Sequence, residues 1–154
     1  MKTIIITLAI SALALIANIE NASGKESLYK NNEVNKQGQI VKTTVCKGED
    51  DKNLILIKQY ENKYDNNGNL RERVLSVWNS NQSKWNAIQK YQYEYSTNGQ
   101  LQILSYTTFN ESNEMWENEI KYAMYTYGSE GQLLTIDYLN IGDKGVLVSD
   151  FSSR

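Results

Sequence analysis

The chain has 154 residues, a formal net charge of −2, no proline, no histidine and one cysteine. The lack of histidine excludes catalysis that depends on an imidazole and metal sites that depend on one. A single cysteine excludes an intramolecular disulfide and a zinc site built from paired thiolates. With 16 Lys and Arg against 18 Asp and Glu, no basic excess is present, so we predict no nucleic-acid partner.

The N-terminal segment is typical of a secretory signal peptide. Lys2 provides the positive start, and the apolar run from residue 4 to residue 17 is followed by polar and small residues. This run of about 14 residues is shorter than the ~20 that a transmembrane helix needs, although an uncleaved anchor is the alternative. We predict a signal peptide over 1–22, cleaved between residues 17 and 24, and one β-repeat domain over 23–154 with no membrane span.

The predicted location is therefore secreted or periplasmic. Cys46 lies far downstream of the apolar run, so no cysteine is placed for the lipid attachment of a lipoprotein signal. We expect Cys46 in a strand, as a buried and inert thiol, with an intermolecular disulfide as the alternative.

A short motif of Gly, then Gln or Asn, then Leu or Ile recurs four times, about every 31 residues. Tyrosine stands four residues before the glycine in three of the copies, and valine in the first. The motif predicts four copies of one unit, with degenerate first and last copies, as is common at the ends of stacked arrays. Its glycines are Gly38, Gly68, Gly99 and Gly131.

Each copy has the pattern of a strand, a tight turn, a second strand and a polar loop. Tyr91, Tyr93 and Tyr95 alternate with polar residues, the period of two that is typical of strands. Asparagine followed by glycine supplies the positive φ angles of hairpin turns. We predict an all-β antiparallel meander of eight or nine strands with little or no helix. Because neither strand face is purely apolar, a strongly twisted or curled sheet or an open barrel is expected.

One irregularity predicts a β-bulge. Trp85 and Tyr91 are separated by an even number of positions, whereas Trp116 and Tyr125 are separated by an odd number. One extra residue therefore lies between Trp116 and Tyr125. A single insertion that keeps the register is a β-bulge, and we expect it near residues 123–124.

Two known kinds of protein share parts of this pattern. Residues 64–70 resemble the Tyr-Asp-x-x-Gly-x-Leu core of YD-type repeats, which form β-hairpins in bacterial surface and toxin-delivery proteins. Residues 93–101 and 125–133 have the form Tyr-x-Tyr-x-x-x-Gly-x-Leu. In this form the chain resembles, over roughly residues 28–148, a family of small secreted Bacteroidetes proteins of unknown function. The resemblance implies a secreted β-rich domain and brings no catalytic residues.

Carboxylates in the polar loops are weak candidates for catalysis or metal binding. Asp65, Asn67 and Asn69 have the spacing of a calcium loop, but Leu70 and Ser76 stand where that loop needs glycine and glutamate. We therefore predict no catalytic residues, no metal and no cofactor. The remaining carboxylates, expected as solvated loop charges because none is paired with a base, are Glu49, Asp50, Asp51, Glu111, Glu114, Glu117 and Glu119.

The candidate site is a set of aromatic residues that flank the long loops, namely Trp78, Trp85, Phe109 and Trp116. One interpretation is that they staple neighbouring strands, with about 0.2–1 kcal/mol per pair. The other is an aromatic platform that binds a glycan or an extended peptide beside Asn and Gln side chains.

The leading functional hypothesis is a non-catalytic secreted binding module for a glycan or a peptide. A structural, self-associating envelope or surface protein is the alternative. A hydrolase, whose carboxylates the sequence does not identify, is the third hypothesis.

Overall fold

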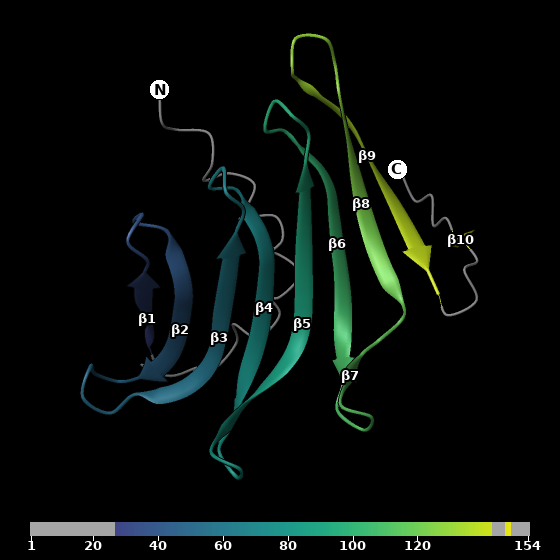
Figure 1. The fold of residues 1–154 in the computed structure, drawn as a ribbon. Coiled ribbons are helices and arrows are strands. Elements are labelled where there is room, and N and C mark those ends of the chain that lie inside the picture. The colour runs from purple at the N-terminus through teal and green to yellow at the C-terminus, as the bar shows by residue number, and fades with distance from the viewer. Residues whose placement is uncertain (1–26, 143–146, 149–154) are drawn as a thin grey trace.

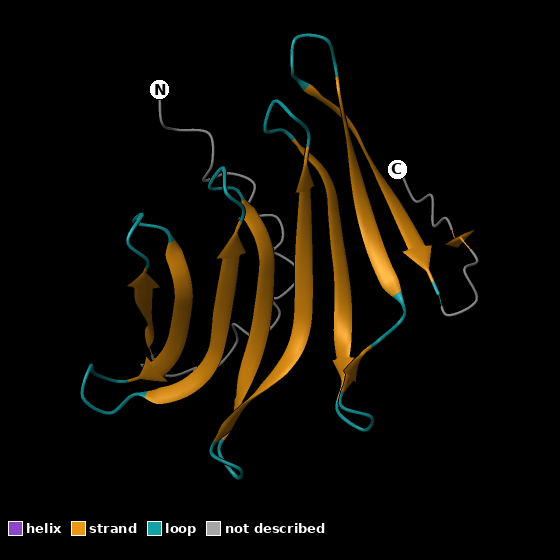
Figure 2. Cartoon of the chain, in the orientation of Figure 1, coloured by secondary structure: helices purple, strands orange, loops and turns teal. Residues whose placement is uncertain are grey.

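The computed structural model describes residues 27–142 and 147–148, so the predicted signal segment lies outside the described residues. The described residues form one antiparallel sheet in which strands adjacent in the chain pair with each other, except that β7 and β8 both pair with β6 (Figures 1 and 2). The prediction of an all-β meander is therefore confirmed. No described residue is helical, and accordingly the described part contains no helix that could cross a membrane.

The sheet is open, because its first and last strands do not pair with each other. Nine strands follow one path, and the short β7 pairs with the end of β6. The strands are β1 (Ser27–Val34), β2 (Ile40–Gly48), β3 (Ile55–Tyr64), β4 (Leu70–Asn79), β5 (Lys84–Tyr95), β6 (Leu101–Asn110), β7 (Met115–Trp116), β8 (Ile120–Tyr127), β9 (Leu133–Ile141) and β10 (Leu147–Val148).

Four tight turns with the same hydrogen bonds join the hairpins at one end of the sheet. In the turn after β3, the Gly68 amide donates to the Asp65 carbonyl at 3.1 Å, and the Asp65 amide donates to the Asn69 carbonyl at 2.9 Å. Gly68 has a φ of 87°, in the left-handed region that glycine adopts without steric cost. The register shifts near each of these turns, and such irregularities increase the local twist.

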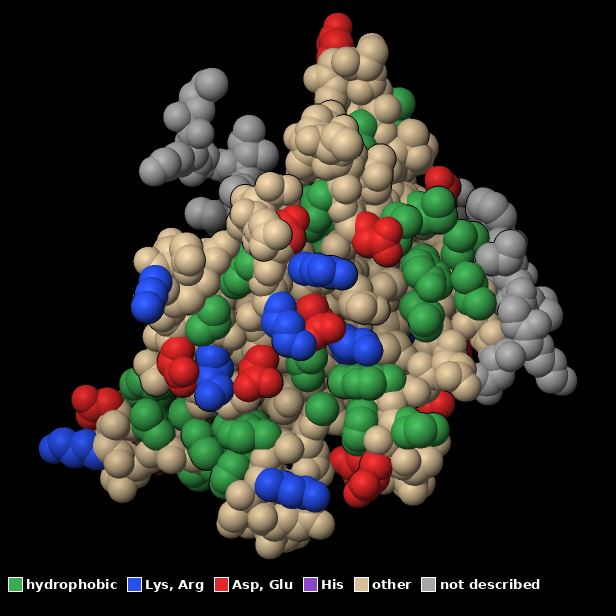
Figure 3. Space-filling view, in the orientation of Figure 1, with side chains coloured by type: hydrophobic (Ala, Val, Ile, Leu, Met, Phe, Trp, Pro, Cys, Tyr) green, Lys and Arg blue, Asp and Glu red, His purple; other side chains and the backbone are tan. Residues whose placement is uncertain are grey.

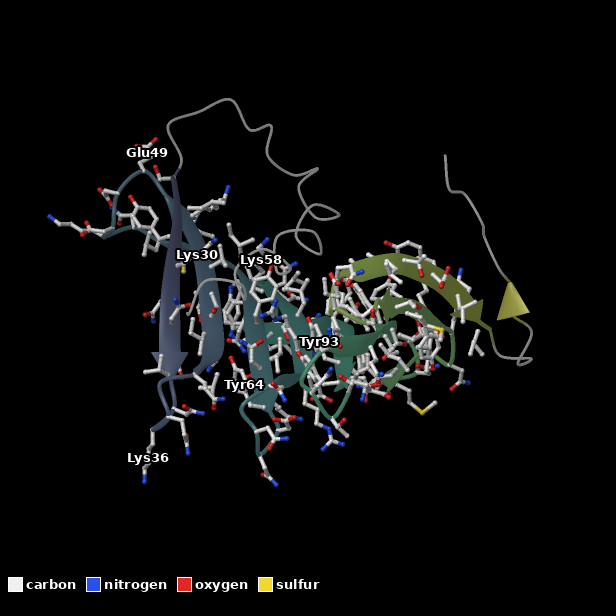
Figure 4. The ribbon with its side chains drawn as sticks, turned by 90° about the horizontal axis from the view of Figure 1, so that it is seen from above. Lys30, Lys36, Glu49, Lys58, Tyr64 and Tyr93 are labelled. Carbon is white, nitrogen blue, oxygen red and sulfur yellow. The ribbon has the colours of Figure 1, made fainter. Side chains whose placement is uncertain are left out.

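The sheet curls along its length as a result. Seen from above in Figure 4, β1 and β2 stand at one side, Lys58 and Tyr93 lie in the middle, and the last hairpin curves away at the other side. The expected strongly twisted sheet is therefore observed, in its open form.

The predicted bulge near residues 123–124 is wrong. Ala123 and Met124 pair in register with β6 on one side and with β9 on the other. The irregularity lies instead at residues 117–119, which separate the two-residue β7 from β8. The sequence indicates one extra residue somewhere after Trp116, but it does not show which residues stop pairing with the neighbouring strand.

A buried threonine explains the true position. The Thr107 hydroxyl lies 2.9 Å from the Glu117 carbonyl oxygen and 3.2 Å from the Glu119 carbonyl oxygen. The Glu117 amide donates to the Thr108 carbonyl at 2.9 Å. Residues 117–119 can leave the ladder because neighbouring groups satisfy their backbone, as buried polar groups require.

Alternation along the strands gives the sheet two chemically different faces. We call one the charged face: its central rows carry ion pairs between Lys42 and Glu33 at 3.5 Å and between Lys63 and Glu72 at 2.7 Å. Figure 3 shows this face, where blue and red side chains alternate across the middle. We call the other the tyrosine face, because the register places most tyrosines of β3, β5, β6 and β8 on it.

The buried apolar core is small and lies mainly on the tyrosine face. Its members on that face are Val45, Leu75 and Ala123; the register aligns Leu75 with Tyr60 and Ala123 with Tyr138, and Val45 with Lys58. Cys46 is buried in β2 with a free thiol, so its predicted place in a strand and its predicted burial are confirmed. With few aliphatic side chains buried, the tyrosine rings supply most of the cover for this face.

Tyrosine hydroxyls join each hairpin to the preceding strand. The tyrosine four residues before a turn glycine donates to the carbonyl two residues after the previous turn glycine. The bonds are Tyr64 to Ile40 at 2.8 Å, Tyr95 to Leu70 at 3.0 Å and Tyr127 to Leu101 at 2.8 Å. Val34 takes this place in the first hairpin, where no described strand precedes it.

Glutamine side chains link some of the turns directly. The Gln39 amide donates to the Gly68 carbonyl, and the Gln100 amide donates to the Gly131 carbonyl, each at 3.2 Å. At the matching place of the second turn, the shorter Asn69 donates to the Asp65 carboxylate within its own turn at 3.0 Å. The link therefore joins the first turn to the second and the third turn to the fourth.

We expect Tyr95→Phe and Tyr127→Phe each to lower the free energy of unfolding by about 1 kcal/mol, because each removes one hydrogen bond to a strand carbonyl. The matched control is Tyr60→Phe. The Tyr60 hydroxyl is buried and has no partner among the described residues, so its removal should leave stability unchanged or raise it. Urea denaturation measures all three, and equal losses in the three variants would contradict the role of the hydroxyl bonds.

Candidate functional site

The four predicted aromatic residues form two cross-strand pairs. Trp78 and Trp85 are directly opposite in β4 and β5, with ring centroids 5.1 Å apart and ring planes at 64°. Phe109 and Trp116 are directly opposite in β6 and β7, with centroids 5.1 Å apart and planes at 75°. Both pairs have the edge-to-face geometry that aromatic quadrupoles favour.

Both loops beside these pairs begin with an asparagine that caps the turn. The Asn79 side-chain oxygen accepts from the amides of Asn81 at 3.1 Å and Gln82 at 3.2 Å. Asn110 accepts in the same way from Ser112 at 2.9 Å and from Asn113 at 3.4 Å. Such turns explain why loops rich in asparagine return the chain so sharply beside each aromatic pair.

The structure brings the two pairs together on the charged face. The Asn86 side chain of β5 donates to the Glu111 carboxylate in the second loop at 3.2 Å. The Lys90 ammonium lies 4.7 Å from the centroid of the Trp116 ring, in cation–π range. We call Trp78, Trp85, Phe109 and Trp116 the aromatic cluster.

All four rings of the aromatic cluster are half-buried. A staple needs only contact between the two rings of a pair, whereas a platform also needs ring surface that a ligand can reach. In an edge-to-face pair, one ring presents its edge to the face of the other, so part of the aromatic surface stays accessible. The observed geometry is thus compatible with both roles. In Figure 3, green side chains gather toward this loop end of the sheet.

The carboxylates near the cluster order the loops. Glu117 accepts from the Asn110 side chain at 2.7 Å, and Glu111 accepts from Asn86. In the first long loop, Asp50 accepts from the amides of Lys52 and Asn53, both at 3.0 Å. These contacts assign a structural role to three of the carboxylates that the sequence singled out.

Asp65 caps its own turn. Its carboxylate accepts from the Asn67 amide at 2.9 Å and from the Asn69 amide at 2.8 Å. These hydrogen bonds, the one from the Asn69 backbone above all, hold the pKa of Asp65 below its usual value. The calcium-like spacing at this turn is therefore explained by turn geometry.

Sequence reasoning missed a polar hollow between the first two turns. Its volume is about 420 Å³, and its lining includes Asn35, Gln39, Asn62, Tyr64 and Asp65. Asn62 and Tyr64 both donate to the Ile40 carbonyl at 2.8 Å, so much of the lining is already occupied in holding the hairpins together. The amide-rich turns are visible in the sequence, but only pairing of the hairpins places them side by side.

The tyrosine face contains phenols with strongly raised pKa values. Burial raises the pKa of Tyr91 to about 12, and the neighbouring phenols of Tyr106 and Tyr93 add to the effect. Burial likewise raises the pKa of Tyr95 to about 12. The Tyr91 and Tyr106 rings are 5.6 Å apart, so ionisation of one phenol would place a charge beside the other.

Fold and site define an open, single-sheet hairpin protein with an aromatic cluster at its loop end. The sequence profile of DUF3836, a family of unknown function, matches residues 1–95. The chain therefore belongs to the DUF3836 family. No curated protein matches it.

Solved structures show the same fold. A DUF3836 family protein from Bacteroides vulgatus is 24% identical with a TM-score of 0.50, over 58% of this chain and 87% of that chain. A protein of unknown function from Bacteroides fragilis is 16% identical with a TM-score of 0.63, over 81% of this chain and 89% of that chain. The expected relationship to a Bacteroidetes family of unknown function is thus confirmed, while the likeness to YD-type repeats stays a local resemblance.

We predict that the protein loses stability between pH 10 and pH 12. In that window an unfolded tyrosine, with a pKa near 10, releases a proton that folded Tyr91 and Tyr95 retain. Because the unfolded state then binds fewer protons, the free energy of unfolding falls as pH rises. Denaturation at several pH values, with tyrosinate absorbance, measures the effect. A stability that is flat across this window, or identical in Tyr91→Phe, would contradict the prediction.

Proposed function

We propose that this protein is a non-catalytic, secreted binding module that takes a glycan at the aromatic cluster. The proposal rests on two edge-to-face aromatic pairs whose rings are half-exposed. One pair joins β4 to β5 and the other joins β6 to β7, and the Asn86–Glu111 hydrogen bond connects the two places at the loop end.

The chemistry around the rings favours a sugar. A sugar ring has apolar C–H faces, which pack on aromatic surface, and hydroxyls, which need hydrogen-bonding partners. Side-chain amides offer both a donor and an acceptor. Those on or beside the two loops are Asn79, Asn81, Gln82, Asn86, Asn110 and Asn113.

The secreted location rests on the signal-like segment at residues 1–22. A binding role without catalysis agrees with the carboxylate contacts, since Glu111 and Glu117 accept hydrogen bonds from amides and order the loops. An extended peptide is the other ligand class that aromatic rings and amides can hold, and the binding experiment includes it.

We expect the purified protein to retain oligosaccharides on a glycan array, and Trp85→Ala or Trp116→Ala to weaken that binding by at least about tenfold, equal to 1.4 kcal/mol. Leu28→Ala, which removes an exposed side chain of β1, is the matched control and should bind normally. Far-ultraviolet circular dichroism checks that each variant is folded.

Two results would overturn the proposal. The first is binding to a peptide array with no glycan retained, which would assign the surface to peptides. The second is unchanged glycan binding in both tryptophan variants together with lower melting temperatures, which would leave the aromatic cluster as a staple between strands.

A further inference from the structure

The last hairpin is built like an internal one. Seven residues after the turn glycine, the four hairpins carry Val45, Leu75, Tyr106 and Tyr138. Val45 is 1% exposed and Leu75 is 2% exposed, whereas Tyr138 is 64% exposed. The first three positions are followed by another hairpin. Beyond β9, β10 pairs only with Asn140 and Ile141.

The acceptor for another hairpin is also present. Leu133 stands at the place of Ile40, Leu70 and Leu101, whose carbonyls accept from the tyrosine of the next hairpin. No tyrosine follows it among the described residues. The Gln132 side chain lies against its own turn at Gly128, instead of reaching a next turn as Gln39 and Gln100 do.

The two edges of the sheet differ in protection. The outer side of β9 is unpaired from residue 133 to residue 139 in the described structure, and its exposed side chains include Leu134, Ile136 and Tyr138. Along the opposite edge, the exposed Leu28 and Val34 of β1 are separated by Lys30 and Asn32, which lie on the same face as the β9 stripe. Charged and polar residues on an edge strand discourage pairing with another sheet, and an apolar edge invites it.

We propose that the outer edge of β9 pairs antiparallel with β9 of a second copy of this chain, which forms a symmetric dimer with one continuous sheet. A two-fold axis places the same patch on both sides, so the Leu134, Ile136 and Tyr138 stripe meets itself. The single charge of β9, Asp137, lies on the other face, so the apolar stripe contains no like charges.

A head-to-tail arrangement fits less well. It would place Lys30 and Asn32 of β1 against the apolar stripe. It would also place Val34, which has no hydroxyl, at the position where the other hairpins have a tyrosine that bonds the preceding strand. The symmetric pairing uses the β9 edge of each chain once and leaves the β1 edges, with Lys30 and Asn32, outside, so it closes as a dimer. This inference does not depend on ligand binding at the aromatic cluster.

The test is the molar mass of the full-length protein in solution, by sedimentation from about 1 µM to about 100 µM, where micromolar association is visible. We expect twice the mass of the chain at the upper end. Tyr138→Lys should shift the mass to that of a monomer throughout, because it puts a charge in the stripe. Val34→Lys, at a comparably exposed residue of β1 (61%), should leave the dimer intact.

A cysteine variant tests the geometry even if Tyr138→Lys does not fold. In Thr135→Cys, a short bis-maleimide should cross-link two chains, since Thr135 is exposed and lies near the middle of the unpaired edge. Val34→Cys should give no cross-linked dimer. A wild-type monomer at all concentrations, a dimer unaffected by Tyr138→Lys, or cross-linking through Val34→Cys would each overturn the proposal.

Discussion

The structure depends on the fact that, within the described residues, no second layer covers either face of its sheet. Most β-domains solve this problem by packing one sheet on another or by closing a barrel. Here tyrosine rings shield one face, and the hydroxyls of Tyr64, Tyr95 and Tyr127 bond to the neighbouring strand. A tyrosine serves both needs at once, since its ring covers apolar atoms and its hydroxyl satisfies a backbone carbonyl. The tyrosine content of the chain therefore follows from its architecture.

The same constraint explains the division between the two faces. Ion pairs between Lys42 and Glu33 and between Lys63 and Glu72 lie across the middle of the charged face, and the aromatic cluster lies at its loop end. Aromatic surface on an otherwise polar face is a feature of binding sites. The exposed stripe of β9 lies on the tyrosine face. Its side chains are exposed because, among the described residues, no further hairpin follows to cover them.

The fold was largely predictable because its signals are local. Gly38, Gly68, Gly99 and Gly131 mark the turns, and alternation around Tyr93 marks the strands. The partners of the aromatic cluster were also predictable, because Trp78 and Trp85 flank one loop symmetrically. The position of the irregular segment was not, since it depends on the Thr107 hydroxyl, a contact with no local signal. The polar hollow and the exposure of β9 depend in the same way on which strand lies beside which.

The position of residues 117–119 has a consequence for how such a chain can change. An extra residue inside a strand would exchange its two faces, but here it lies beside the long loops and the strands keep their faces. The turn end, in contrast, has one length in all four turns. The sheet thus has one end where the turns are uniform and one end where the loops can vary, and the aromatic cluster lies at the second end. Loops there can vary in length and sequence while the scaffold below them stays the same.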